Sequence, residues 1–161
     1  MNTKQIKALI LPVTALVVIP AILAFDFSSN SFKINSYLPS FIGILLCLTG
    51  LVILATTARM LAATGKKTIA PWDADTILVT SGMYSYTRNP MIGGALLVLL
   101  GEAAVFGSAA ILVWFFLFFI ISDIYFNLVE EPALEKKFGE NYRRYKEKVP
   151  KWLPRIKPQK K

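Results

Sequence analysis

The sequence predicts an all-α integral membrane protein with about four transmembrane helices and a cytoplasmic C-terminal amphipathic helix. The first observation is the apolar composition: 55% of the 161 residues are hydrophobic, and the mean hydropathy is +0.53. The second is that three long stretches of the sequence, which we call gaps, hold at most one charged residue each: residues 8–25, 34–58 and 89–122. A chain of this length corresponds to a single domain, residues 1–161.

The first two gaps predict two N-terminal spans within residues 1–62. A helix of about 20 residues rises about 30 Å and crosses the hydrocarbon core of a bilayer, and these gaps hold 18 and 25 residues. The alternative for the first gap is a cleaved signal peptide, because Lys4 and Lys7 precede it. We favour a retained helix, since the apolar stretch is long for a signal and no A-x-A cleavage pattern follows it.

The third gap predicts a hairpin of two further spans. It holds 34 residues and one formal charge, Glu102, and as one helix it would extend about 50 Å, too far for a single crossing. We therefore expect the chain to fold back at Phe106-Gly107-Ser108. Pro90 suits the first turn of the third helix, where its missing N–H is not needed, and Asn89 before it is a candidate N-cap.

The net charge of +8 is placed where a membrane protein would need it. From Leu128 onward there are eleven Lys or Arg residues and five acidic ones, which favours contact with anionic lipid over nucleic acid. By the positive-inside rule, the basic tail and the linker before the hairpin place both termini in the cytoplasm. Cys47 stands alone, so no disulfide or thiol–metal framework is expected.

The residues after the hairpin predict one amphipathic helix. Its apolar residues recur every three or four positions, which gives one stripe along the helix: Leu134, Phe138, Tyr142, Tyr145 and Val149. A basic amphipathic helix next to a membrane is typical of one that lies at the interface. It could instead fold over the cytoplasmic mouth of the bundle as a lid.

The charged residues at the ends of the hairpin predict a polar site. Arg88 precedes the hairpin and Glu130-Glu131 follow it, so both reach the same end of two apolar segments. The chain contains no histidine, which excludes His-based triads, His-ligated metals and imidazole bases, and we expect no metal. The remaining groups suit the binding and orientation of a charged cofactor. Methyl transfer from a sulfonium needs little more than an aligned acceptor.

Two ordered motifs flank the hairpin. The first is Ile77-Leu78-Val79-Thr80-Ser81-Gly82-x-Tyr84-x-Tyr86-x-Arg88-Asn89-Pro90, and the second begins at Glu130-Glu131 and closes in Val149-Pro150-x-Trp152-x-Pro154. With Ala70-Pro71-Trp72 in the linker, this set resembles the isoprenylcysteine carboxyl methyltransferase family, within the superfamily of phospholipid methyltransferases. The resemblance covers Gly65 to Pro154 and implies an integral membrane enzyme that uses S-adenosylmethionine from the cytoplasmic side.

The resemblance also implies roles for individual residues. Residues 63–161 would hold the cofactor-binding linker, the hairpin and the C-terminal helix. The residues implied to contact the cofactor are Leu78, Val79, Gly82, Tyr84, Asn89, Pro90 and Glu130. The residues implied to act in catalysis are Arg88, Glu130 and Glu131, with either glutamate as the acting one. The chain departs from the family pattern at Thr76, Asn89 and Ile92, which leaves the contacts at those positions open.

Alternatives remain for the substrate and for the function. The acceptor is expected to be lipophilic: a prenylcysteine carboxylate first, or an isoprenoid or phospholipid amine. A reductase related to the membrane sterol reductases is less favoured because this chain is short. A small four-helix transporter or lipid-binding protein would give Glu102 a function, but it leaves Arg88 and Glu130-Glu131 unexplained. Without that function, Glu102 is a protonated carboxyl bonded to a neighbouring helix. Asp123 either pairs with Arg59 or lines the pocket.

Overall fold

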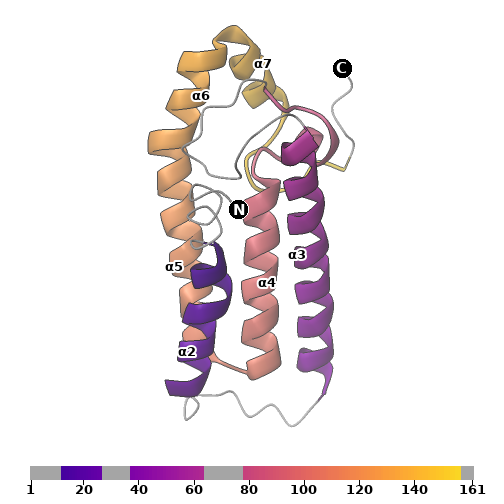
Figure 1. Cartoon of the computed structure of the whole chain (residues 1–161), viewed down its shortest axis with the longest axis vertical. Coiled ribbons are helices and arrows are strands. Elements are labelled where there is room, and N and C mark those ends of the chain that lie inside the picture. The colour runs from indigo at the N-terminus through magenta and orange to yellow at the C-terminus, as the bar shows by residue number, and fades with distance from the viewer. Residues whose placement is uncertain (1–11, 27–36, 64–77, 157–161) are drawn as a thin grey trace.

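The computed structural model describes residues 12–26, 37–63 and 78–156, and every regular element in that part of the chain is helical. Long helices stand side by side, with the shorter α6 and α7 at one end (Figure 1). The elements in chain order are η1 (Thr14–Val18), α2 (Ile19–Asp26), α3 (Leu38–Ala63), η3 (Gly82–Ser85), α4 (Pro90–Phe106), α5 (Ala109–Tyr125), η4 (Phe126–Glu130), α6 (Glu131–Phe138) and α7 (Glu140–Lys148).

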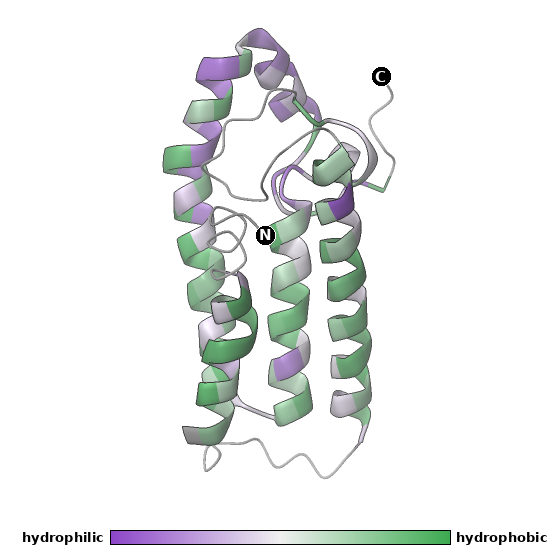
Figure 2. Ribbon diagram, in the orientation of Figure 1, coloured by the Kyte–Doolittle hydropathy of each residue, from purple (hydrophilic) through white to green (hydrophobic). Residues whose placement is uncertain are grey.

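Two of the described helices are long and apolar enough to cross a membrane. One is α3, and the other is the continuous helix Ala109–Phe138, formed by α5, η4 and α6. The segments Thr14–Phe25 and Pro90–Phe106 are apolar but shorter. Figure 2 shows apolar residues along the lower part of the bundle and polar residues at the α6–α7 end. The outward-facing apolar side chains, such as Val52 and Ile121, are more than half exposed, as expected of surfaces that face lipid.

Glycines allow α3 and α4 to pack backbone to backbone. A Cβ atom at Gly50 would lie 2.6 Å from the carbonyl oxygen of Gly94, and one at Gly43 would lie 2.7 Å from that of Gly101. Both helices therefore place two glycines seven residues apart on their shared face. Such small residues let helices approach closely inside a membrane, where packing rather than hydrophobic burial drives association.

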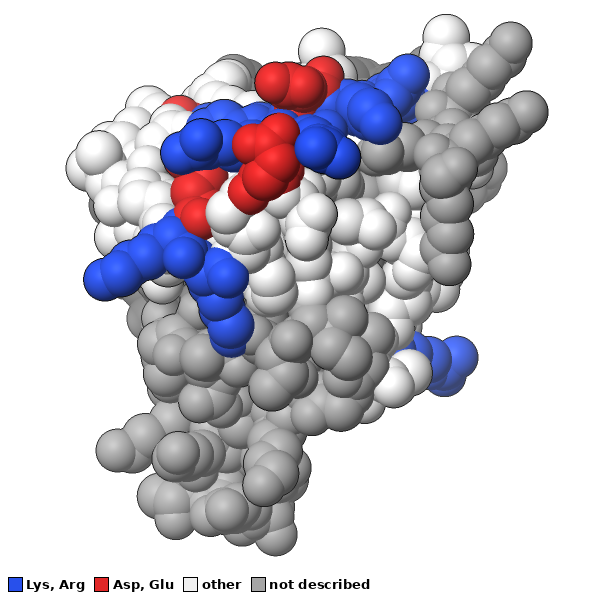
Figure 3. Space-filling view, turned by 90° about the horizontal axis from the view of Figure 1, so that it is seen from above, with Lys and Arg blue, Asp and Glu red and all other residues white. Residues whose placement is uncertain are grey.

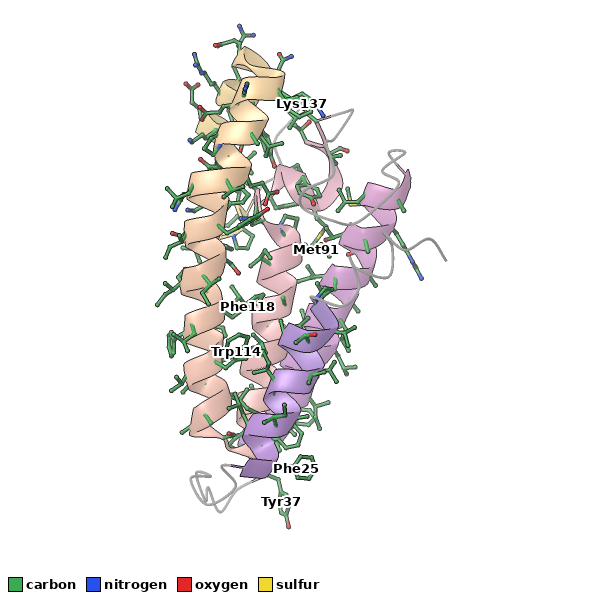
Figure 4. All side chains as sticks on the ribbon, turned by 60° about the vertical axis from the view of Figure 1, so that its left-hand side comes forward. Phe25, Tyr37, Met91, Trp114, Phe118 and Lys137 are labelled. Atoms are coloured by element: carbon green, nitrogen blue, oxygen red, sulfur yellow. The ribbon has the colours of Figure 1, made fainter. Side chains whose placement is uncertain are left out.

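The predicted fold-back at Phe106-Gly107-Ser108 is present. Helix α4 ends at Phe106, Gly107 adopts a φ of 60°, and α5 begins at Ala109. Ser108 caps α5, because its hydroxyl oxygen accepts a hydrogen bond from the Ile111 amide at 3.4 Å. Trp114, labelled in Figure 4, joins α5 to the N-terminal segment by donating from Nε1 to the Ala15 carbonyl oxygen at 2.9 Å.

The prediction of one continuous C-terminal amphipathic helix is wrong. Gly139, with φ 53° and ψ −127°, separates α6 from α7, and α7 folds back toward the bundle (Figure 1). The apolar stripe is still the core of this region. Tyr142, Tyr145 and Val149 are buried together, and the residues packed against them are Leu78, Leu134 and Phe138. The stripe thus packs on the chain that leads into α4.

Candidate functional site

The polar end of the α4–α5 hairpin brings Arg88 and Glu131 together. Arg88 lies just before α4, which starts at Pro90 as predicted, and Glu131 begins α6. The Arg88 Nη1 donates to Glu131 Oε1 in an ion pair. The two side chains are only 10% and 8% exposed. A pair this deeply buried fixes the two ends of the hairpin relative to each other.

Lys146 on α7 completes the surroundings of Glu131. Its Nζ lies 2.6 Å from Glu131 Oε2 and 3.0 Å from Glu135 Oε1. The hydrogen bonds to Glu131 and Glu135 raise the pKa of Lys146 above its usual value. Both oxygens of Glu131 therefore have a cationic partner, and this carboxylate holds α7 as well as the chain before α4. Figure 3 shows the acidic side chains at this end interleaved with Lys and Arg.

A cavity opens beside this ion pair. Its walls combine apolar side chains with three tyrosines, one cation and one carboxylate. The lining residues are Leu61, Leu78, Val79, Tyr84, Arg88, Phe126, Glu130, Leu134, Tyr142 and Tyr145. An apolar pocket with a few converging polar groups is typical of a binding site for an amphipathic or partly charged small molecule.

The tyrosines connect α7 to the segment before α4. Tyr145 is buried and donates from its hydroxyl to the Tyr84 carbonyl oxygen at 2.7 Å, and its ring lies 6.1 Å from that of Tyr142. Burial raises the pKa of both phenols, and Glu131 raises that of Tyr142 further. Both hydroxyls therefore stay protonated near neutral pH. The proton of Tyr145 is used by the Tyr84 carbonyl oxygen, whereas the Tyr142 hydroxyl has no hydrogen-bond partner within the described residues and can donate to a ligand.

Most of the residues expected to contact a cofactor lie at this cavity. Leu78, Val79, Tyr84, Arg88 and Glu130 line it, whereas Glu131 reaches it through Arg88. Lining residues that the sequence did not single out for the site are Leu61, Phe126, Leu134, Tyr142 and Tyr145. The last three belong to the predicted amphipathic stripe, and only the bend at Gly139 brings α7 to the cavity.

The other three expected residues shape the backbone next to the cavity. Gly82 has a φ of 59° and starts η3, and Pro90 occupies the first turn of α4. Asn89 is the N-cap of α4, but its side chain makes no capping hydrogen bond. Its buried Nδ2 has no hydrogen-bond partner within the described residues. Thr76, the motif Ala70-Pro71-Trp72 and the N-terminal lysines lie outside the described residues.

Glu102 is separate from this site. It lies five residues before Gly107, toward the turn of the hairpin, whereas Arg88 lies at the opposite end of α4. It is not among the residues that line the cavity. The described residues contain no cluster of three or more His, Cys, Asp or Glu side chains that could hold a metal ion.

Comparison with known proteins adds independent information. A sequence model of the phospholipid methyltransferase family matches residues 38–141, more than half of the chain. The chain is 34% identical over 93 residues to the Schizosaccharomyces pombe protein-S-isoprenylcysteine O-methyltransferase, a match that covers 51% of this chain and 35% of that enzyme. It is also 38% identical over 58 residues to an uncharacterized Haemophilus influenzae protein, covering 36% of this chain and 92% of that protein. The chain thus spans about a third of the length of the yeast relative.

Proposed function

Because this chain belongs to the phospholipid methyltransferase family, we propose that it transfers a methyl group from S-adenosylmethionine to a lipophilic acceptor in the membrane. The observation that carries the proposal is the cavity that Arg88 and Glu130 line at the polar end of an apolar helix bundle. Such a position serves a reaction between a water-soluble donor and a lipid-like acceptor. In this proposal the helices make four spans, and both termini and the cavity face the cytoplasm.

The residues of the cavity fit the charges of S-adenosylmethionine. The methionyl end of the donor carries an ammonium and a carboxylate, next to a positive sulfonium. Glu130 supplies a negative charge, and Arg88 supplies a guanidinium that can bind a carboxylate. The Nε of Arg88 is buried and has no hydrogen-bond partner within the described residues, so it remains a donor for a ligand. The apolar and tyrosine side chains of the wall suit an adenine ring.

The two neighbouring glutamates are proposed to have different roles. Glu130 lines the cavity, and we assign it to the positive groups of the donor. Glu131 is buried and bound to Arg88 and Lys146, so we assign it to holding Arg88 in place. S-adenosylmethionine supplies a methyl group activated by its own charge. The protein then contributes mainly orientation, which can supply a large part of a rate enhancement.

A prenylcysteine carboxylate is the favoured acceptor. This preference rests on the similarity to the yeast isoprenylcysteine O-methyltransferase over 93 residues. It also agrees with the chemistry, because methylation of a carboxylate needs no general base. The second candidate is a phospholipid amine, which the description of the matching family favours. An amine must lose a proton, and Glu130 is the carboxylate placed at the cavity to accept one.

The test is isothermal titration of the detergent-solubilised protein with S-adenosylhomocysteine. We expect Arg88→Ala and Glu130→Gln to weaken binding at least tenfold, and Glu102→Gln, outside the cavity, to leave it unchanged. Absence of binding to the unmodified protein at millimolar ligand would exclude this donor. Transfer of a labelled methyl group to a farnesylated cysteine, compared with phosphatidylethanolamine vesicles, then decides between the two acceptors.

A further inference from the structure

The segment that follows α7 ties the two sides of the candidate site together. We call residues 149–155 the C-terminal strap. It runs from the end of α7 past the start of α4 (Figure 1), between the chain before α4 and the end of α5. Val149 at its start is fully buried in the core with Tyr142 and Tyr145. The strap is thus continuous with the wall of the cavity.

On one side, the strap holds the backbone of the residues around Arg88. The Arg88 amide donates to the Pro150 carbonyl oxygen at 2.9 Å, and the Thr87 hydroxyl donates to that of Lys151 at 2.8 Å. The Arg155 amide donates to the Tyr86 carbonyl oxygen at 3.0 Å. Three consecutive residues that lead into α4 are therefore bonded to the strap, and the direction of the Arg88 side chain depends on its position.

On the other side, Asp123 near the end of α5 holds the strap. Its Oδ1 accepts a hydrogen bond from Trp152 Nε1 at 2.8 Å and forms an ion pair with Lys151. Its Oδ2 accepts a hydrogen bond from Asn127 at 2.9 Å, and Asn127 in turn accepts one from Lys151 at 2.7 Å. The Trp152 ring packs against Phe119 of α5 at 5.1 Å. The Asp123 carboxylate thus orients Lys151 and Trp152, the two strap residues directly after Pro150.

We propose that Asp123 is a positioning residue for the reaction: through Lys151 and Trp152 it fixes the strap, and through the strap it orients Arg88 at the cavity. This inference rests on the proposed function. Asp123 does not line the cavity, so its effect on ligand binding must be indirect. The Nζ of Lys151 also lies 5.9 Å from the ring of Phe126, a residue of the cavity wall. Loss of Asp123 would therefore disturb two walls at once.

The first test needs no ligand. Hydrogen exchange of the detergent-solubilised protein is compared between the unmodified chain, Asp123→Ala and Asp123→Asn. We expect the amides of Arg88 and Arg155, which bond the strap to the chain before α4, to exchange at least tenfold faster in Asp123→Ala. Asp123→Asn should fall in between, because its amide oxygen still accepts from Trp152 while the ion pair with Lys151 is lost. The control is Glu140→Gln, which removes the exposed pair with Arg144 on α7 and should leave these amides unchanged.

The second test asks whether Asp123 acts through Arg88. We expect Asp123→Ala to weaken binding of S-adenosylhomocysteine about tenfold, and the same substitution in an Arg88→Gln background to weaken it less than twofold further. A merely structural role would give independent, additive effects in the two backgrounds. Asp123→Asn, the milder variant, is used for the same comparison if Asp123→Ala fails to fold.

The outcomes separate this inference from the proposed function. If the unmodified protein does not bind the ligand, the proposed donor is wrong and the exchange experiment alone decides on the strap. Unchanged exchange at the amides of Arg88 and Arg155 in Asp123→Ala would overturn the inference. Additive losses of affinity, in a protein that does bind S-adenosylhomocysteine, would also overturn the inference. Faster exchange together with non-additive affinity would establish Asp123 as a positioning residue.

Discussion

Arg88 and Glu131, 43 residues apart in the sequence, form a buried ion pair that joins the two ends of the α4–α5 hairpin. Removing two charges from water is costly, and a buried pair offsets this cost only with good geometry and additional hydrogen bonds. Glu131 is also bound by Lys146 from α7. The pair therefore connects three segments, namely the chain before α4, the start of α6, and α7. It stands beside the cavity whose wall Arg88 forms.

The losses of stability caused by removing each partner of this pair should not be additive. Glu131→Ala leaves the Arg88 guanidinium buried without its carboxylate, and we expect a loss of about 3–5 kcal/mol in the free energy of unfolding. The double variant Arg88→Ala/Glu131→Ala should lose less than the sum of the two single variants. Denaturant titration in detergent measures the free energy of unfolding of the two single variants and of the double variant. Additive losses would show that the two side chains do not interact in solution.

Gly139 determines whether α7 reaches the cavity. Its φ of 53° and ψ of −127° lie in a region that side chains with a Cβ atom rarely occupy. A Cβ atom there would meet no neighbour within 4 Å, so Gly139→Ala tests backbone strain alone. We expect a loss of about 1–3 kcal/mol in stability and weaker binding of S-adenosylhomocysteine, because a continuous α6–α7 helix would carry Tyr142 and Tyr145 away. Unchanged affinity would mean that α7 does not form part of the site.

The local features of the fold were predictable where a short motif determines the geometry. Pro90 marked the start of α4, and Phe106-Gly107-Ser108 marked the turn, because proline and glycine restrict or free the backbone at single positions. The 3.6-residue stripe correctly identified Tyr142, Tyr145 and Val149 as one apolar face. It did not show that the face bends at Gly139, since a single glycine within a helical pattern is also compatible with an unbroken helix.

The site was predictable in its charged residues and less so in its contacts. Arg88 and Glu130-Glu131 stood out because they bring opposite charges to the same end of two apolar segments. Which glutamate lines the cavity depends on the direction of each side chain after the π-helical turn η4, and sequence spacing does not give that direction. Asp123 was expected to pair with Arg59 or to line the pocket. It binds Lys151 and Trp152 instead, a long-range contact that no periodicity indicates.

The glycine contacts between α3 and α4 give a test of the bundle with a matched control. In Gly50→Ala the new Cβ atom would lie 2.6 Å from the Gly94 carbonyl oxygen, so the helices must separate. We expect a loss of about 1–3 kcal/mol in the free energy of unfolding. Gly93→Ala, on the same helix as Gly94, adds a Cβ atom that meets nothing within 4 Å, and it should stabilise α4 by about 0.5–1 kcal/mol. Equal effects of the two substitutions would contradict the close packing of α3 on α4.

The ion pairs of Lys146 should give the protein a pH-dependent component of stability. The hydrogen bonds to Glu131 and Glu135 raise the pKa of Lys146 in the folded protein. The stabilising contribution of these ion pairs is therefore fully present at pH values below the pKa of lysine in the unfolded chain, about 10.4. It is lost as the pH rises through the higher folded pKa. The difference in Tm between the unmodified protein and Lys146→Met should therefore be constant from pH 8 to about pH 10 and narrow above it.

The control for this measurement is Lys136→Met, which removes an exposed lysine of α6 and the same net charge. Groups that titrate in all three proteins and do not interact with Lys146 or Lys136 cancel in the difference. The Tm difference for Lys136→Met is expected to be small at pH 8, since an exposed charge contributes little. A Lys146→Met variant as stable as Lys136→Met at pH 8 would show that α7 is not held by Glu131 and Glu135. The cavity would then lack the anchor that places Tyr142 and Tyr145 in its wall.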